Sequence, residues 1–112
     1  MSKLEKTLNG NFYTILTKIE NGILNGSYTA SLEDSSNFHS GDARCSVRVF
    51  ERYSYLGSNR VSLNVTVFQN GTDPVRVSAI TSGGSQAMFF KINTLGEEAF
   101  LDKLKEILEP DL

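Results

Sequence analysis

The stretch ARCSVRVFERYSYLGSNRVSLNVTVFQ, Ala43 to Gln69, carries the clearest pattern in this chain and decides its fold class. Its first half places mostly apolar side chains on odd positions, at Cys45, Val47, Val49, Tyr53 and Tyr55. Its second half does the same, at Val61, Leu63, Val65 and Val67. A period of two is typical of a strand with one face in the core and one face in water. The stretch therefore predicts two long antiparallel strands whose odd positions face the core.

A tight hairpin is predicted between these two strands. We expect Leu56 to pair with Arg60 around the loop Gly57-Ser58-Asn59, because a three-residue loop keeps odd positions on one face. Glycine and asparagine can adopt the left-handed backbone conformation that such loops need.

Length and composition indicate one globular domain that spans residues 1–112. The net charge of −2 gives no electrostatic reason to expect general binding to nucleic acid or membranes. The N-terminus lacks the apolar run of a signal peptide, and no stretch approaches the roughly 20 apolar residues of a membrane span. The single cysteine cannot form an internal disulfide. These features predict a cytoplasmic protein.

Two helices are predicted, one on each side of the strand region. Asn11 is the expected N-cap of the first, which ends at Gly22 or runs to Asn25-Gly26. Its buried stripe is Phe12, Ile15, Leu16, Ile19 and Ile23. Thr94-Leu95-Gly96-Glu97 is a capping box for the second, which Pro110 stops. The second stripe is Phe100, Leu101, Leu104, Ile107 and Leu108.

Weaker patterns complete the strand order. Residues 2–8, 75–79 and 87–92 are expected to be strands, with turns at 70–74 and 83–85. Residues 27–34 alternate with Tyr28, Ala30 and Leu32 inward, and 35–42 have the composition of a loop, so Asp34 would pair with Ala43. The expected fold is α+β in two layers. Five to six antiparallel strands carry the N-terminal helix and a long C-terminal helix on one face.

This order resembles the TATA-binding-protein-like and helix-grip architectures, in which a C-terminal helix lies across a curved antiparallel sheet. A second resemblance covers nearly the whole chain, through Ser31–Ser36, Arg44–Thr66 and Ser78–Asp102. These stretches look like a family of small, uncharacterised bacterial proteins classed as a domain of unknown function. The resemblance implies a bacterial, cytoplasmic single domain and assigns no activity, cofactor or catalytic residue.

Glu51 is the sharpest oddity, because it falls on the inward parity between Val49 and Tyr53. Burial of an unpaired carboxylate is costly. One interpretation is an acid that lines a pocket between the sheet and the C-terminal helix, with Tyr53 and Tyr55 as neighbours. The other is that Glu51 lies beyond the helix, or at a bulge that turns it outward.

An arginine-rich outer sheet face is the second candidate site. Five arginines share the even parity: Arg44, Arg48, Arg52, Arg60 and Arg76. Phe50 and Phe68 are apolar members of the same face. Such a face can bind single-stranded nucleic acid, an acidic partner or the acidic last helix of a second copy. The ordinary interpretation is a solvated face with polar side chains.

No constellation for catalysis or metal binding is present. Gly83-Gly84-Ser85 precedes a strand pattern, whereas phosphate loops lead into a helix. His39 lies among scattered acids without metal-ligand spacing, and Cys45 is expected to face the core. We therefore expect no catalytic site, no cofactor and no metal.

The sequence favours a small binding module that uses the arginine face or the interface between sheet and helix. Its expected partners are an acidic protein or a second copy, with a small apolar ligand as a further option; nucleic acid and membranes are not expected. The alternative is a helix-grip-like carrier or enzyme for an apolar small molecule. A carrier needs a cavity, whereas an interaction module needs a solid core.

Overall fold

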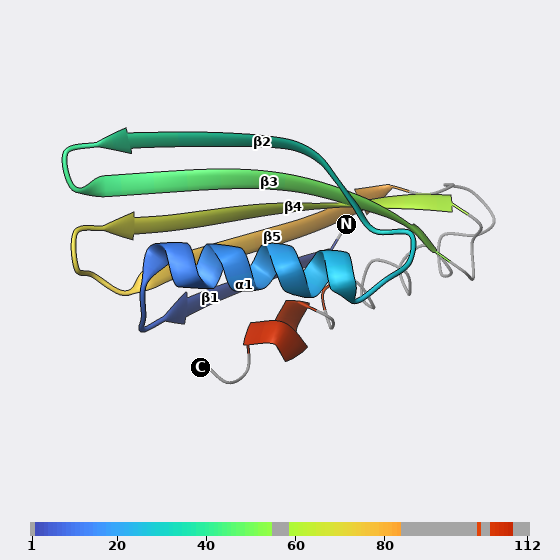
Figure 1. Ribbon diagram of the computed structural model, residues 1–112, viewed down its shortest axis with the longest axis horizontal. Helices are drawn as coiled ribbons and strands as arrows, with labels where there is room; N and C mark the ends of the chain where they lie inside the picture. Colours follow the sequence, from blue (N-terminus) through green and yellow to red (C-terminus); the bar gives the residue numbers. More distant parts are fainter. Residues whose placement is uncertain (1, 55–58, 84–100, 102–103, 109–112) are drawn as a thin grey trace.

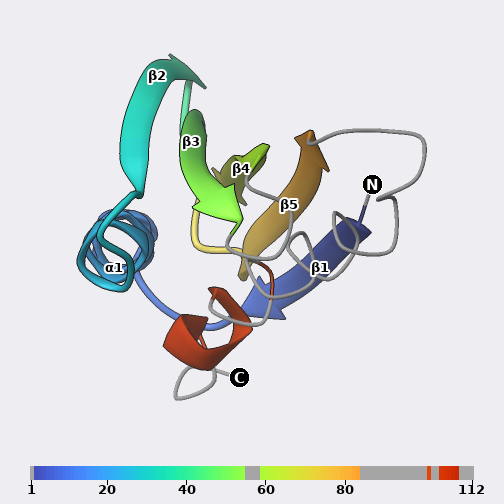
Figure 2. The same cartoon turned by 90° about the vertical axis from the view of Figure 1, so that its right-hand side faces the viewer.

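A computed structural model describes residues 2–54, 59–83, 101 and 104–108 of the chain (Figure 1). Five strands form one antiparallel sheet in the spatial order β1-β5-β4-β3-β2. They are β1 (Ser2–Leu8), β2 (Ser31–Ser40), β3 (Ala43–Ser54), β4 (Asn59–Asn70) and β5 (Val75–Gly83). Figures 1 and 2 show α1 (Phe12–Asn25) and the helical residues near the C-terminus on the same side of this sheet. The α+β class and the antiparallel sheet are thus confirmed.

Helix α1 follows the predicted pattern closely. The Asn11 side chain caps it by accepting a hydrogen bond from the Thr14 backbone N–H at 3.0 Å. The predicted stripe is buried in full: Phe12, Ile15, Leu16, Ile19 and Ile23. The helix continues past Gly22 to Asn25, where the Gly26 N–H donates to the Ile23 carbonyl. Gly22 is therefore an interior residue of α1.

One hydrophobic core lies between the sheet and the helices. From the C-terminal helical residues it includes Leu101, Leu104 and Leu108, with Ile107 partly buried at its border. From β4 and β5 it takes Val61, Leu63, Val65, Val67, Val75, Val77 and Ala79. The α1 stripe, Leu8 and Phe50 complete it. We call the sheet face toward this core the inner face and the opposite one the outer face.

The prediction that odd positions of β3 face the core is wrong. Arg60 pairs with Tyr53, so its predicted pairing with Leu56 is also wrong, and Ser54 pairs with Asn59, so four residues, 55–58, separate the two strands. An even number of loop residues joins positions of opposite parity. The odd valines of β4 keep the inner face, and β3 places Phe50, fully buried, beside them. The odd side chains of β3 consequently lie on the outer face.

Strand β2 differs from its prediction as well. It runs from Ser31 to Ser40 and pairs Ser40 with Ala43, so Ser35–Asp42 is mostly strand and the predicted pairing of Asp34 with Ala43 is wrong. Tyr28, expected inward, is fully exposed. Gly41, at a φ of 57°, begins the short turn, and the Asp42 carbonyl accepts a hydrogen bond from the Gly71 N–H at 3.0 Å. This hydrogen bond joins the turn that follows β2 to the turn that follows β4.

Several predictions fall outside the described residues. They are the last strand at 87–92, the capping box at 94–97, Phe100, Tyr55, most of the 57–59 loop and much of the C-terminal helix. In the described part of the chain, no helix is long and apolar enough to cross a membrane.

Candidate functional site on the outer sheet face

Cross-strand register aligns the outer-face side chains in rows. One row runs Phe38, Cys45, Phe68, Arg76, Thr7 across all five strands. The next runs Ser36, Val47, Thr66, Ser78, Glu5. Directly opposite residues in such a sheet have Cβ atoms about 4.5–5.5 Å apart, close enough to act on one ligand.

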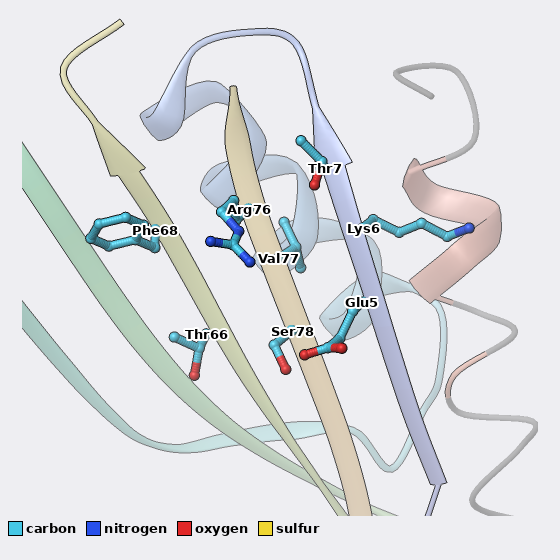
Figure 3. Close-up of a pocket in the computed structure, with 8 residues that line it drawn as sticks. All are labelled: Glu5, Lys6, Thr7, Thr66, Phe68, Arg76, Val77 and Ser78. Atoms are coloured by element: carbon cyan, nitrogen blue, oxygen red, sulfur yellow. The ribbon is translucent and has the colours of Figure 1, made fainter. Parts of the chain in front are cut away.

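A depression with a volume of about 330 Å³ lies over β1, β5 and β4 on this face (Figure 3). Its outer-face lining is Glu5, Thr7, Thr66, Phe68, Arg76 and Ser78, which we call the Phe68–Arg76 site. Phe68 and Arg76 are directly paired neighbours on β4 and β5. Figure 3 shows Arg76 in the middle of this group, with the Phe68 ring on one side and Thr7 on the other.

Arg76 is the chemical centre of the Phe68–Arg76 site. Its side chain is exposed, and it makes no hydrogen bond or ion pair with any other residue that the structure describes. A guanidinium presents five N–H donors in a plane and matches a carboxylate or phosphate in a bidentate geometry. The hydroxyls of Thr7, Thr66 and Ser78 add further donors around it. The site can therefore hold an anionic oxygen group.

Glu5 sets a limit on what the site accepts. Its carboxylate lines the depression and lies 4.0 Å from the Lys3 ammonium, a pair that is largely exposed. The negative charge of Glu5 disfavours a ligand with several anionic groups, because any carboxylate that came close to Glu5 would be repelled. A single anionic group close to Arg76 and distant from Glu5 fits best.

An apolar depression of about 180 Å³ lies on the other side of Phe68. Phe38 and Cys45 line it together with Phe68, in the same cross-strand row. Phe38 is 58% exposed and Phe68 37% exposed. Phe68 thus separates a cationic recess from an apolar one, and a partner can contact both.

The arginine row predicted for the outer face is divided between the two faces. Of the five, Arg60 and Arg76 lie on the outer face, with Phe68. Arg44, Arg48 and Arg52 lie on the inner face with Phe50, because the parity of β3 is reversed. The prediction of one face with five arginines is therefore wrong, and a binding role for any of them remains a prediction.

Arg48 is held between the sheet and α1. Its side chain is only 9% exposed, and its Nε donates to the Glu20 carboxylate at 2.7 Å. Its Nη1 donates to Asn37 Oδ1 at 2.9 Å and to the Val47 carbonyl at 3.0 Å. Asn37 Oδ1 also accepts from the Ser46 hydroxyl at 2.7 Å. These bonds satisfy the buried guanidinium and join β2, β3 and α1.

The other two inner-face arginines, Arg44 and Arg52, are also partly enclosed by neighbouring side chains. The Arg44 guanidinium lies 5.8 Å from the Phe12 ring centre and 5.6 Å from that of Tyr13, a cation–π arrangement at the start of α1. Partial burial lowers the pKa of Arg52 through desolvation. Arg48 is thus buried and the other two are half-buried, and Arg44 also lines the depression beside Phe38.

Glu51 lies on the outer face, opposite Ser62. It forms an ion pair of 2.8 Å with Arg60, whose guanidinium also lies 5.3 Å from the Tyr53 ring centre. The hydrogen bond from Arg60 to Glu51, and then the charge of Glu51, raise the pKa of Arg60. The predicted inner pocket with Glu51 and Tyr53 is therefore wrong; Tyr55 lies outside the described residues. No bulge in β3 causes this outcome, since the whole strand has the reversed parity.

Sequence reasoning missed Glu5, Thr7 and Phe38 as members of the candidate site. Glu5 and Thr7 reach it because β1 pairs with β5, which is distant in sequence. Cys45 was expected inward and faces outward. No group of three or more His, Cys, Asp or Glu side chains able to hold a metal occurs among the residues the structure describes.

Comparison with known proteins places the chain in a family. No curated protein matches the chain. One similar solved structure is the crystal structure of the protein TTHA0849 from Thermus thermophilus. It shares 11% sequence identity over 96% of each chain, with a TM-score of 0.30. A family model described as "Family of unknown function (DUF6054)" matches residues 1–110. The chain therefore belongs to the DUF6054 family, a family of unknown function.

Proposed function

We propose that this protein is a small binding module that holds an acidic segment of a partner protein on its outer sheet face. The observation that carries the proposal is the exposed Arg76 guanidinium beside Phe68, with no partner among the described residues. Exposed arginine and aromatic side chains are the residue types most enriched in protein interfaces.

The shape of the site favours a protein segment over a small molecule. A volume of 330 Å³ is at the lower end of the range of about 300–1,000 Å³ for small-molecule pockets, and its walls are the side chains of a sheet face. The two depressions flank Phe68, so an extended segment can place a carboxylate at Arg76 and an apolar side chain near Phe38.

The packing of the inner face supports an interaction module over a carrier of apolar molecules. Val61, Leu63, Val65, Leu104 and Ile19 are all fully buried in one cluster, and their contacts fill the space that a ligand would need. The proposal includes a helix-grip-like arrangement, in which the C-terminal helix lies across the sheet. The presence of Leu104 in the same cluster supports this arrangement.

Fluorescence anisotropy tests the proposal with a labelled extended peptide that carries one glutamate and one leucine in an otherwise serine- and glycine-rich chain. We expect binding at low salt that weakens as ionic strength rises, and an Arg76→Ser variant should lose about tenfold or more in affinity, as expected for a charge-assisted hydrogen bond. The same peptide with glutamine in place of the glutamate should lose about tenfold or more in affinity, because it lacks the carboxylate for Arg76.

Arg60→Ser is the matched control. Arg60 is on the same face and strand β4 as the site but eight positions from Phe68, about 27 Å along a strand, and it is already paired with Glu51. Its replacement should change the affinity less than about twofold, well below the effect of a charge-assisted contact. Equal losses in both variants, or no binding by the wild type at low salt, would refute the proposal.

A further inference from the structure

Strand β2 is an edge strand with little protection against pairing with another chain. It is the last strand in the sheet order, and no described residue pairs with its free edge (Figure 1). Nine of its ten residues, from Leu32 to Ser40, are exposed. Natural edge strands are usually shortened, charged with lysine, interrupted by proline or twisted by a bulge. From Ser35 to Ser40, β2 has none of these features.

The opposite edge provides a comparison within the same sheet. Strand β1 has seven residues, and Lys3, Glu5 and Lys6 bring charges of both signs to that edge. In β2 the acids Glu33 and Asp34 and the single register shift all lie near the start of the strand. The remaining six residues form a long and regular edge that carries no charge when His39 is neutral.

The backbone groups at this edge are held ready for pairing. The turn between β2 and β3 has two residues, and such a turn closes on a hydrogen-bonded pair, here Ser40 with Ala43. Bonded pairs alternate, so the N–H groups of Ser35, Asn37 and His39 point to the free edge. The Ser35 N–H already donates at 2.8 Å to the side chain of Asp34, which agrees with its outward direction, so pairing at Ser35 exchanges one acceptor for another. The Asn37 side chain is anchored to Ser46 and Arg48, which fixes the strand position.

We propose that a second copy of this chain pairs with β2, antiparallel and about a two-fold axis at Asn37, so that the two sheets become one continuous sheet. This inference goes beyond the proposed binding of an acidic segment and does not depend on it. The two copies of the Phe68–Arg76 site would then lie on the same side of the dimer, because the axis is perpendicular to the sheet.

The axis at Asn37 is selected by the side chains it brings together. Asp34 meets the Ser40 hydroxyl of the other copy, small Ser36 meets Phe38, and Ser35 meets His39, in each case on one face. An axis at Phe38 would place Asp34 opposite Asp42, and like charges directly opposite each other are destabilising. An axis at Ser36 would place the Asp34 carboxylate opposite the Phe38 ring. A two-fold contact of this kind is self-complementary, as a symmetric dimer requires.

Sedimentation velocity over a range of protein concentrations, with His39→Pro and His39→Ala, tests this inference. Proline removes the outward N–H and is tolerated on edge strands where that N–H faces solvent, so the β2–β3 ladder is retained. We expect a wild-type dimer, a dissociation constant raised at least about tenfold by His39→Pro, and a change below about twofold with His39→Ala. Circular dichroism should show the same fold for all three proteins.

Amide hydrogen exchange on the wild type gives a second readout that needs no variant. The amides of Asn37 and His39 should gain protection as the protein concentration rises, whereas those of Ser36 and Phe38 should not change. A wild type that stays monomeric at millimolar concentration overturns the inference. A dimer that persists in His39→Pro but dissociates in Arg76→Ser also overturns it, since the outer face would then be the contact.

Discussion

The Arg48 guanidinium and the Glu20 carboxylate form an ion pair across the boundary between sheet and helix, with 2.7 Å between Nε and Oε2. The Arg60–Glu51 pair has nearly the same length, 2.8 Å, on the outer face. The two pairs differ in burial, since the Arg48 side chain is 9% exposed and that of Arg60 is 50% exposed. Equal distances should therefore give unequal contributions to stability.

Replacement of the acid in each pair measures this difference. Glu20→Ala should lower the free energy of unfolding by about 1–3 kcal/mol, because it leaves a buried guanidinium with fewer acceptors. Glu51→Ala should change it by less than about 1 kcal/mol, as exposed ion pairs do. Urea denaturation of both variants checks the prediction. Equal losses would mean that burial of Arg48 does not matter.

The reversed parity of β3 predicts opposite responses at adjacent positions. Phe50→Ala should cost about 3–5 kcal/mol, because the ring is fully buried. Val49→Thr, on the outer face, should cost less than about 1 kcal/mol, as surface substitutions usually do. Thermal denaturation of the two variants distinguishes them. A larger loss for Val49→Thr than for Phe50→Ala would mean that the odd positions of β3 face the core, as the sequence pattern predicts.

The buried residues of the C-terminal helix should contribute as much to the free energy of unfolding as the other core residues do. Leu104 is fully buried among core side chains, so Leu104→Ala should cost about 2–5 kcal/mol. Lys105→Ala, at the exposed neighbouring position, should stay within about ±0.5 kcal/mol. Chemical denaturation gives both values. A loss below about 0.5 kcal/mol for Leu104→Ala would mean that this segment is not packed on the sheet.

Gly22 brings α1 close to Ile107. A Cβ added at Gly22 would lie 2.5 Å from Ile107 Cδ1, closer than two non-bonded carbon atoms approach without a shift of one of them. Gly22→Ala should therefore destabilise the protein by about 1 kcal/mol, since overpacking outweighs the gain in helix propensity. In an Ile107→Ala background the same change should stabilise by about 0.5–1 kcal/mol. A double-mutant cycle of unfolding free energies measures the reversal of sign, and two additive effects would contradict it.

The elements that the sequence predicted well are those with a strong local signal. Asn11 and the α1 stripe define a helix by themselves, and the alternation of Val61, Leu63, Val65 and Val67 defines the buried face of β4. The part of β2 from Ser35 to Ser40 was predicted to be a loop, because it is exposed on both faces and no apolar alternation marks it. The face of β3 depended on whether its loop has three or four residues, a difference that alternation alone does not determine.

The candidate site was predictable only in part for the same reason. Phe68 and Arg76 were named because β4 and β5 alternate clearly. Their association with Arg44, Arg48 and Arg52 was wrong, since the even positions of β3, which carry these arginines, lie on the inner face. There Glu20 of α1 neutralises the charge of Arg48. Glu5 and Thr7 required knowledge of the β1–β5 pairing, which joins residues as far apart as Ser2 and Thr81.

That pairing has a consequence for how the chain acquires its structure during synthesis. Strands β2 to β5 pair with their neighbours in sequence order, whereas the backbone of Ser2 meets the side chain of Thr81 across a separation of 79 residues. Long loops are slow to close, and the ribosome delivers the N-terminus first. Strand β1, which emerges before the other four, therefore cannot pair until β5 has left the exit tunnel. We expect β1 to be the last of the five strands to join the sheet.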